Sequence, residues 1–456
     1  MSRERDGFGF APGGHRAQSA AMSAAAASSA LPKSAFAIIF GVSVATALGN
    51  TGLISVLPAI GRSLEIPDEM VVAIFSLSAV LWAVSSPLWA RASDCYGRKP
   101  LMMVGLAGFM VSMTVCGAVV SAGLRHLATP MVIFGLLLCG RALFGLFGAA
   151  SSPATQAYVA DQTPREQRTQ AMSGLAGAIG LGTVVGPFLA PMFIYPVVGL
   201  AGPLFTFALI AAVMLIIVWR RLPDSRPDPL ATEEPEDEAP PGKPLPIWRD
   251  RRVIPFLVYG FVVATCQTAQ QQTLGFLIID KLGVSPLDAQ RPIAIAMMFG
   301  AMAALLAQWG VIRMFEMTPR QLLRWGVACA AAGNLMVALA HDYSTVVAGY
   351  AVASLGFGFA RPGFTAGGSL AVGSRDQARV AGAIASVNGI NAVLAPAFMA
   401  LYRHAQAAPF LLNMVLMLAM LAYAFMSGAL RKAAPSPATS DDATRATLER
   451  NDEGGA

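Results

Sequence analysis

Long stretches without a charged side chain recur along the whole chain and constrain its fold more than any other feature. Seven of them have the length of a single membrane span, namely residues 34–61, 70–90, 101–124, 253–279, 292–312, 380–402 and 405–430. A helix of about 20 apolar residues crosses the hydrocarbon core of a bilayer. Only 13% of the 456 residues are charged, and the mean hydropathy is +0.58, whereas soluble domains carry about 25% charged residues. We therefore expect an all-α, multi-spanning membrane protein.

Five further spans bring the expected count to twelve. The charge-free run 169–219 is 51 residues long, enough for two spans separated near residues 199–203. Single arginines interrupt the runs 127–160 and 343–374, and the run 325–341 is the shortest. With the amino terminus inside, the inner segments hold 25 of the 32 lysines and arginines, and the outer loops hold five. This asymmetry predicts that both termini face the cytoplasm.

One hydrophilic segment between spans, residues 222–252, divides the predicted helices into two sets of six, and its acidic run indicates a solvated linker. Prolines separated by 209 residues, Pro153 with Pro362 and Pro187 with Pro396, suggest that the two sets are repeats. The expected parts are a disordered cytoplasmic tail (1–33), a six-helix bundle (34–221), a cytoplasmic linker (222–252), a second six-helix bundle (253–432) and a disordered cytoplasmic tail (433–456).

The turn between the second and third spans carries one acid, three bases and a glycine, in the sequence Ala90-Arg91-Ala92-Ser93-Asp94-Cys95-Tyr96-Gly97-Arg98-Lys99. A generic inner turn accounts for the bases but not for Asp94 or the spacing to Gly97. The pattern resembles the loop between helices 2 and 3 of the major facilitator superfamily of transporters. The resemblance implies a conformational gate of Asp94, Gly97, Arg98 and Lys99. Asp94 would face the start of helix 11 near Arg379 and lock the halves together while the cavity opens outward.

Arg141 is expected near the middle of the fourth helix, at a rise of about 1.5 Å per residue. A guanidinium at that depth is costly, so it should face a cavity or a partner. The stretch Arg141-Ala142-Leu143-Phe144-Gly145 resembles the superfamily motif linked to proton transfer in drug:proton antiporters. The alternative is a structural arginine that caps polar groups of neighbouring helices.

Two further segments resemble superfamily motifs. After helix 4, the spacing from Tyr158 to Asp161 and on to Arg168 resembles the family's gate loop and implies that Asp161 and Arg168 are cytoplasmic gate partners; a plain charged turn is the alternative.

In helix 5, the sequence Gly182-Thr183-Val184-Val185-Gly186-Pro187 resembles the antiporter signature, although Ala190-Pro191 replaces the usual Gly-Gly. Glycines four apart allow close helix packing and Pro187 kinks the helix, which is also the alternative explanation.

The resemblance places helices 1, 4, 7 and 10 around a central path. Helix 1 offers Asn50 and Thr51, and helix 7 offers Gln267, Gln270 and Gln271, whose spacing puts them on one helix face. We expect that face to point into the cavity, with interhelical hydrogen bonding as the alternative. Arg361 in helix 10 is expected on the substrate or proton pathway, close enough to the cytoplasmic interface to reach it, and Asn388 and Asn391 in helix 11 near the gate.

No aspartate or glutamate falls deep in any predicted span, and helix 1 has Asn50 where many drug:proton antiporters carry a carboxylate. We therefore expect a neutral or anionic, amphipathic substrate bound near Arg141. The cysteines and histidines lack metal-ligand spacing, and no phosphate-binding lysine motif is present, so no metal or other cofactor is expected. The base-rich balance follows the membrane sides, so no nucleic-acid partner is expected.

These patterns predict a twelve-helix major facilitator fold, with two six-helix bundles related by pseudo-twofold symmetry. The resemblance implies a monomeric, proton-coupled exporter of a small molecule in the bacterial inner membrane, working by alternating access. An importer or facilitator of a small solute with the same fold is the first alternative. A non-transporting membrane enzyme or scaffold is the second, and the sequence offers no catalytic constellation for it.

Overall fold

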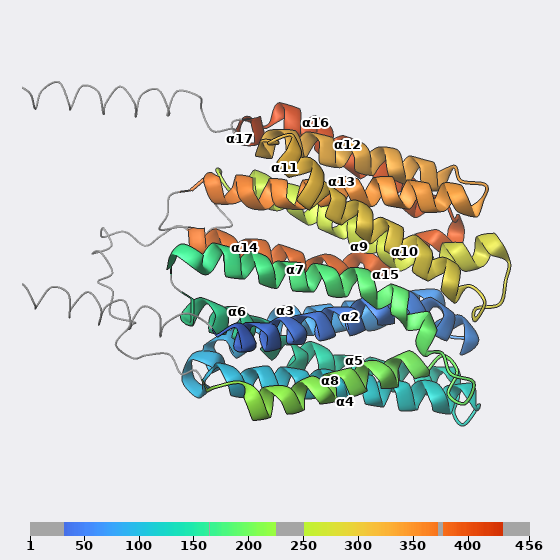
Figure 1. Cartoon of the computed structure of the whole chain (residues 1–456). Helices are drawn as coiled ribbons and strands as arrows, with labels where there is room; N and C mark the ends of the chain where they lie inside the picture. Colours follow the sequence, from blue (N-terminus) through green and yellow to red (C-terminus); the bar gives the residue numbers. More distant parts are fainter. Residues whose placement is uncertain (1–31, 164, 225–249, 373–376, 432–456) are drawn as a thin grey trace, which may run out of the picture.

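The computed structural model describes residues 32–163, 165–224, 250–372 and 377–431. Almost all of the predicted tails 1–33 and 433–456, and most of the predicted linker 222–252, lie outside the described residues. Within the described ranges the chain consists of helices joined by short turns (Figure 1). The all-α prediction is therefore confirmed.

The first half of the molecule runs to the end of α8. Its elements are α2 (Lys33–Ser63), α3 (Asp68–Tyr96), α4 (Arg98–Leu124), α5 (Pro130–Phe147), η1 (Gly148–Ala150), α6 (Ser151–Asp161), α7 (Arg165–Leu189), η2 (Ala190–Phe193) and α8 (Gly202–Arg221). The short 3-10 turn η1 joins α5 to α6 in a single rod. Pro187 lies inside α7, which ends in the 3-10 turn η2, as expected where proline removes a backbone hydrogen bond.

The second half begins after the linker. Its elements are α9 (Ile254–Leu282), α10 (Gln290–Leu305), η5 (Leu306–Val311), α11 (Ile312–Met314), α12 (Pro319–Ala338), α13 (Tyr343–Leu370), α14 (Gln377–Ile390), η7 (Asn391–Leu394), α15 (Ala395–His404), α16 (Ala408–Met426) and α17 (Gly428–Arg431). A π-helical segment, η5, joins α10 to α11, and η7 joins α14 to α15. The elements follow the predicted spans closely along the chain.

Nine helices or helical rods among the described residues are long and apolar enough to cross a membrane. The other three candidates for the twelve predicted spans are α9, α12 and the rod from α14 to α15. A polar stretch around Gln270 interrupts the apolar character of α9. The described helices are thus consistent with twelve spans.

Local chemistry sets several helix boundaries. Gly97 between α3 and α4 has φ +94°, and Gly283 after α9 has φ +60°; glycine adopts this left-handed backbone without the strain that a Cβ causes. Asp342 caps α13, because its carboxylate accepts a hydrogen bond from the Thr345 amide at 3.0 Å. Hydrogen bonds from the Ser344 hydroxyl and from Thr345 lower the pKa of Asp342 to about 2.

The two halves lie side by side, with the second half above the first in Figure 1. They meet where α7 contacts α10, where α2 contacts α9, and where α3 contacts α14, η7 and α15. The described residues next to the tails and the linker lie at one end of the bundle, which we call the linker end; we call the opposite end the loop end. The site described next lies between the halves.

Candidate functional site

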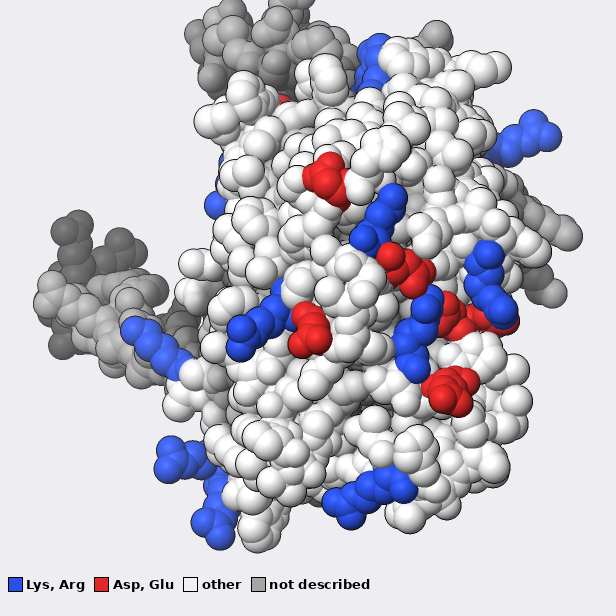
Figure 2. Space-filling model, turned by 90° about the vertical axis from the view of Figure 1, so that its right-hand side faces the viewer, with Lys and Arg blue, Asp and Glu red and all other residues white. Residues whose placement is uncertain are grey.

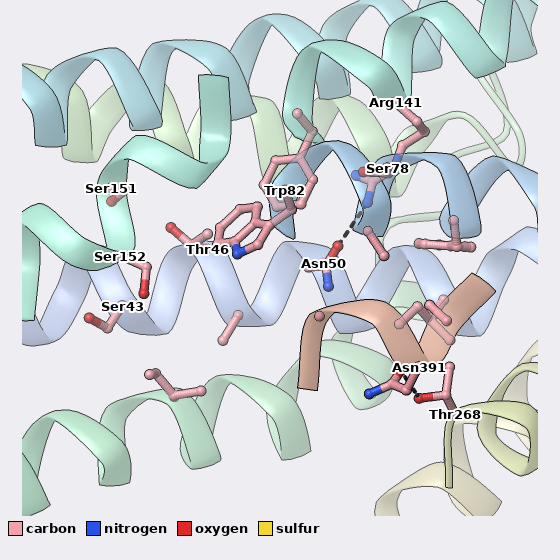
Figure 3. A pocket seen from close by; sticks show the side chains of 18 of the residues that line it. Ser43, Thr46, Asn50, Ser78, Trp82, Arg141, Ser151, Ser152, Thr268 and Asn391 are labelled. Atoms are coloured by element: carbon pink, nitrogen blue, oxygen red, sulfur yellow. Dashed lines mark hydrogen bonds between the residues drawn. The ribbon is translucent and has the colours of Figure 1, made fainter. Parts of the chain in front are cut away.

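A cavity of about 440 Å³ lies between the two halves (Figure 3). It extends from the middle of the bundle, at Asn50 and Arg141, toward the linker end, where Ser43 and Gln156 line it. Helices α2, α3, α5 and α6 supply most of its wall, and α7, α9, α14 and η7 supply the rest. Among the lining residues Arg141 alone carries a charge, so the chemistry of the cavity depends on how that side chain is held.

Arg141 is almost fully buried, with 2% of its surface exposed. Its guanidinium carbon lies 5.0 Å from the centre of the Phe75 ring and 4.5 Å from that of Phe144, and such ring faces attract cations. Its Nη2 donates to the Asn50 side-chain oxygen at 2.9 Å (Figure 3). Nε and Nη1 have no hydrogen-bond partner among the described residues. Two rings and one amide therefore hold this cation, and the described residues that line its cavity include no carboxylate.

The wall contributed by α9 differs from the predicted one. Gln271 lines the cavity as expected, but its companions there are Thr268 and Gln272. Gln270 is buried outside the cavity with its amide unpaired among the described residues, and Gln267 does not line the cavity. The cavity face of α9 is thus rotated by about one residue. Glutamines occur at four of the six positions from 267 to 272, so they occupy more than one face and the sequence could not select one.

The residues predicted in the tenth and eleventh spans differ in their position relative to the cavity. Asn391 lines the cavity and accepts a hydrogen bond from Thr268 Oγ1 at 2.9 Å. Arg361 is exposed on α13 and does not line the cavity. It lies on the helix face between Gly358, which packs on α10, and Phe364, which packs on Gly260 of α9. Its part in the pathway stays a prediction.

At the linker end, Arg98 forms the centre of a charged cluster. Its side chain is buried and donates to Asp94 Oδ1 at 2.5 Å, to Asp161 Oδ2 at 2.9 Å and to Ser93 Oγ at 3.1 Å. The cluster joins the α3–α4 turn, formed at Gly97, to the end of α6. It lies entirely within the first half.

Both acids of the predicted gate therefore pair with Arg98. The Asp94 side chain is 64% exposed, and its contact with the start of α14, where most side chains lie outside the described residues, stays a prediction. Asp161 also pairs with Arg98, while Arg168 is exposed. The contact of Asp94 with the eleventh helix was expected for a cavity open at the other end, and this cavity extends toward the linker end. Lys99 lies 3.7 Å from Asp224.

Gly182 and Gly186 bring α7 into close contact with α2. A Cβ at Gly182 would lie 2.7 Å from Ala47 Cβ, and one at Gly186 would lie 2.5 Å from Thr51 Oγ1. Thr51 donates to the backbone oxygen of Gly182 at 3.3 Å across this contact. The glycine spacing thus has a packing role that the structure displays directly; its role in antiport stays a prediction.

The cavity is closed toward the loop end by contacts between the halves. Ser76 Oγ donates to the Ala392 backbone oxygen at 2.7 Å, which joins α3 to η7. Gly275 of α9 packs against Pro58 of α2. No sequence pattern indicated these contacts, or the place of Phe75 and Trp82 in the cavity wall, because apolar and small residues are common in every span.

Comparisons with known proteins agree with this architecture. The model of the Major Facilitator Superfamily matches residues 39–396. Multidrug resistance protein 2 of Bacillus subtilis (strain 168) is 24% identical over 379 residues, which cover 80% of this chain and 88% of that protein. The class H tetracycline resistance protein of Pasteurella multocida is 27% identical over 190 residues, covering 40% of this chain and 42% of that protein. The crystal structure of a bacterial homolog to the human lysosomal transporter Spinster, inward-facing and unoccupied, aligns with a TM-score of 0.65 at 15% identity, covering 88% of this chain and 98% of that one.

Proposed function

The chain belongs to the Major Facilitator Superfamily, and from this premise we propose that it exports small amphipathic compounds, neutral or anionic, in exchange for protons. The family's members are transporters rather than enzymes, and this chain is a multi-pass integral membrane protein. Its fold suits alternating access, in which two bundles rock around a central site. The cavity that extends toward one end and is closed at the other corresponds to one state of that cycle.

Export is supported by the relatives. Two of them are named for multidrug resistance and for tetracycline resistance. Gly182 and Gly186 pack α7 closely against α2, and Pro187 lies inside α7, where the antiporter signature was expected. The same signature is the feature that favours export over import in the sequence.

The proposal that the substrate is neutral or anionic rests on the positive charge of Arg141 in the cavity wall. No acidic residue is among the described residues that line the cavity, and Asn50 holds Arg141 with a neutral amide. A cationic group about 6 Å from this guanidinium would be repelled by roughly 3 kcal/mol at an effective dielectric constant near 20. That corresponds to roughly a 100-fold preference against a cation. A neutral or anionic amphiphile avoids this cost, and Phe144 and Trp82 offer it apolar surface.

We further propose that the protein is a monomer in a bacterial inner membrane, with both termini in the cytoplasm. The loop end carries five described bases together with six described acids, namely Arg62, Arg125, Lys281, Arg291 and Arg403 with Glu65, Asp68, Glu69, Asp280, Asp288 and Asp342. Figure 2 shows acids and bases mixed on this face. Most other bases of the sequence belong to the linker end and its flanking segments, which favours the cytoplasm for that end.

The test uses purified protein in vesicles with an imposed pH gradient. An exporter of the proposed kind moves an anionic amphiphilic dye against its gradient only while protons flow the other way, and adding dye collapses the pH difference. Arg141→Ala should abolish this transport. Arg141→Lys should weaken it, because lysine keeps the charge but lacks the planar group that stacks between Phe75 and Phe144.

The outcomes separate the candidates. Unchanged transport by an Arg141→Ala protein that reaches the membrane in normal amount would refute the role of Arg141. Dye movement that is indifferent to the pH gradient would instead indicate a facilitator, and dye movement in the same direction as the protons would indicate an importer.

A further inference from the structure

A second hollow lies between α4 and α8, at the edge of the first half that faces away from the second half (Figure 1). Its volume is about 580 Å³, and it shares no lining residue with the central cavity. Apolar side chains form its walls, namely Met103, Val104 and Ala107 of α4 with Leu215 and Trp219 of α8. Lys99, Pro100 and Asp224 line it at the linker end. We call this hollow the α4–α8 groove.

The length of the groove matches one leaflet of a bilayer. From Lys99 to Ala107 the helix α4 rises about 12 Å, and the hydrocarbon of one leaflet is about 15 Å deep. Nearer the loop end α4 and α8 close up, because a Cβ at Gly117 would lie 3.0 Å from the Phe205 ring. Trp219 is 59% exposed, and indole rings favour the level of the lipid headgroups. The groove therefore suits one acyl chain with its headgroup beside Lys99.

Bases gather at the linker-end mouth of the groove. The Lys99 side chain is 15% exposed, and its Nζ lies 3.7 Å from Oδ1 of Asp224, farther than the roughly 2.8 Å of a charge-assisted hydrogen bond. Asp224 is itself 76% exposed. The guanidinium carbon of Arg220 lies 5.8 Å from the centre of the Trp219 ring. Arg220 and its neighbour Arg221 are exposed and have no ion-pair partner among the described residues.

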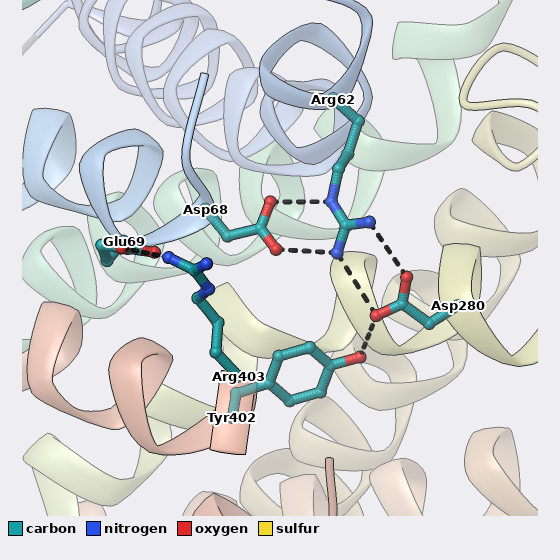
Figure 4. Close-up of polar contacts among 6 residues, drawn as sticks. All are labelled: Arg62, Asp68, Glu69, Asp280, Tyr402 and Arg403. Carbon is teal, nitrogen blue, oxygen red and sulfur yellow. Dashed lines mark hydrogen bonds and ion pairs between the residues drawn. The ribbon is translucent and has the colours of Figure 1, made fainter. Parts of the chain in front are cut away.

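The arginines of the loop end provide a contrast, because the protein itself supplies their counter-charges (Figure 4). Arg62 forms two hydrogen bonds with Asp68, both at 2.7 Å, and its Nη1 lies 3.1 Å from Asp280 Oδ1. Arg403 lies 2.5 Å from Glu69. The bases at the mouth of the groove have no such arrangement, so they remain able to bind an anion from outside the protein.

The neighbouring acids do not cancel the positive charge of the mouth. Three bases there face the single carboxylate of Asp224, which leaves two positive charges. The cluster beside the groove, in which Arg98 pairs with Asp94 and Asp161, has one negative charge in excess. The surroundings of the groove thus keep about one unbalanced positive charge, and an anionic group at the mouth brings them to balance.

We propose that the α4–α8 groove binds an anionic phospholipid from the leaflet at the linker end. One acyl chain lies along Ala107 and Leu215, and the phosphate lies between Lys99 and Arg220, since basic sites between spans bind lipid headgroups. The phosphate takes the place of the exposed Asp224 as the partner of Lys99. In the proposed orientation this is the cytoplasmic leaflet, where anionic lipids are abundant. The lipid is a bound partner and not a transported compound.

Quenching of Trp219 fluorescence by brominated lipids tests the site. The full chain is reconstituted in phosphatidylcholine vesicles with rising fractions of either phosphatidylglycerol or phosphatidylcholine that carries bromine on its acyl chains. Bromine quenches a tryptophan that it contacts. The part of the quenching that is lost in Trp219→Phe reports on the groove, because the other tryptophans are the same in both proteins.

We expect the Trp219 signal to reach half of its quenching at an about fivefold lower fraction of phosphatidylglycerol than of phosphatidylcholine, as about one unbalanced base near a membrane surface predicts. The double variant Lys99→Gln, Arg220→Gln should lose this preference, and Lys99→Arg, Arg220→Lys should keep it. The matched control is Arg125→Gln, Arg291→Gln, which removes two exposed bases at the loop end and should also keep the preference.

A further variant separates binding in the groove from attraction to its charges. Ala107→Phe fills the inner end of the groove and leaves every base in place, so it should abolish the preference for phosphatidylglycerol. Soluble glycerol phosphate should leave the quenching unchanged, because it has no acyl chain to place in the groove.

Equal quenching by the two lipids in the unmodified chain would overturn the proposal. A preference that survives in Lys99→Gln, Arg220→Gln would place the anionic lipid elsewhere, and one that survives in Ala107→Phe would show that the lipid does not enter the groove. Displacement by glycerol phosphate would assign the bases to a free phosphate instead. The assay involves no transport, so its result does not depend on the proposed export.

Discussion

Arg141 is held in the cavity wall by neutral groups, one amide and two aromatic rings. The guanidinium is held by two aromatic rings and by the Asn50 side-chain oxygen, and the lining residues include no carboxylate. Aromatic faces stabilise a cation without neutralising it. The positive charge therefore remains available to the contents of the cavity, which is why we connect it with the charge of the substrate.

The substitution Asn50→Asp tests whether the charge of Arg141 selects the substrate. The new carboxylate would lie at hydrogen-bonding distance from Arg141 Nη2, where the amide oxygen now lies at 2.9 Å. Since it neutralises Arg141, the repulsion of cations should fall. We expect transport of an anionic dye to drop at least about tenfold and transport of a cationic dye to appear or increase.

Vesicle uptake of the two dyes measures this change, with Asn50→Gln as the control that alters size but not charge. Equal anionic transport by Asn50→Asp and the unmodified chain would contradict the proposed role of the cavity charge.

At the scale of single elements, the contact of α7 with α2 depends on the absence of side chains. A Cβ at Gly186 would lie 2.5 Å from Thr51 Oγ1 and in contact with the Leu48 backbone oxygen. These neighbours are helix backbone and a buried side chain, and they have little room to shift. The spacing of Gly182 and Gly186 therefore fixes the distance between two helices that both line the cavity.

Gly186→Ala should accordingly destabilise the protein by about 1–3 kcal/mol, as overpacking of a well-packed contact does. Thermal unfolding of the purified protein in detergent measures it as a lower Tm. Gly135→Ala is the matched control, since a Cβ at Gly135 in α5 would meet nothing within 4 Å, and its Tm should not fall. Equal Tm values for Gly186→Ala and Gly135→Ala would show that α7 and α2 can separate at no cost.

The helices also show which features the sequence patterns predicted correctly and which they did not. The spans, the break between α7 and α8, and the turn at Gly97 follow the predicted positions closely, because hydrophobic length and glycine conformation are local properties. The cavity face of α9 was predicted about one residue out of phase. The packing of α9 against its neighbours, among them α13, α16, α14 and η7, decides which of its glutamines meets the cavity.

At the scale of the whole molecule, the halves are joined at the loop end and the cavity between them extends toward the linker end. Alternating access requires this arrangement to reverse. Contacts at the loop end must then break, and the predicted contact of Asp94 with the start of α14 belongs to the reversed state. That assignment stays a prediction.

A cross-link across the loop end should therefore stop transport. In a Glu69→Cys, Arg403→Cys protein lacking the exposed Cys95 and Cys139, a short cleavable reagent that joins the two thiols should reduce export to background. Cleaving the reagent should restore it, because the bridged side chains come from α3 and α15 of opposite halves. The vesicle assay measures both steps.

Each single-cysteine variant, treated with the same reagent, is the control and should keep its activity. Full export by the cross-linked protein would mean that the halves do not separate at this end.

Local patterns in the chain were enough to predict the all-helical membrane fold, the positions of the spans, the Gly97 turn and the arginine in the middle of the fourth span. Each depends on the length, apolarity or backbone freedom of a short segment, and these properties do not need the rest of the chain. The packing of the helices brings Asp94 and Asp161 to Arg98, places Thr268 and Gln272 beside Gln271 in the cavity wall, and brings Arg62 to Asp280, 218 residues away. These contacts depend on how two bundles are positioned relative to each other, and no local pattern encodes that position.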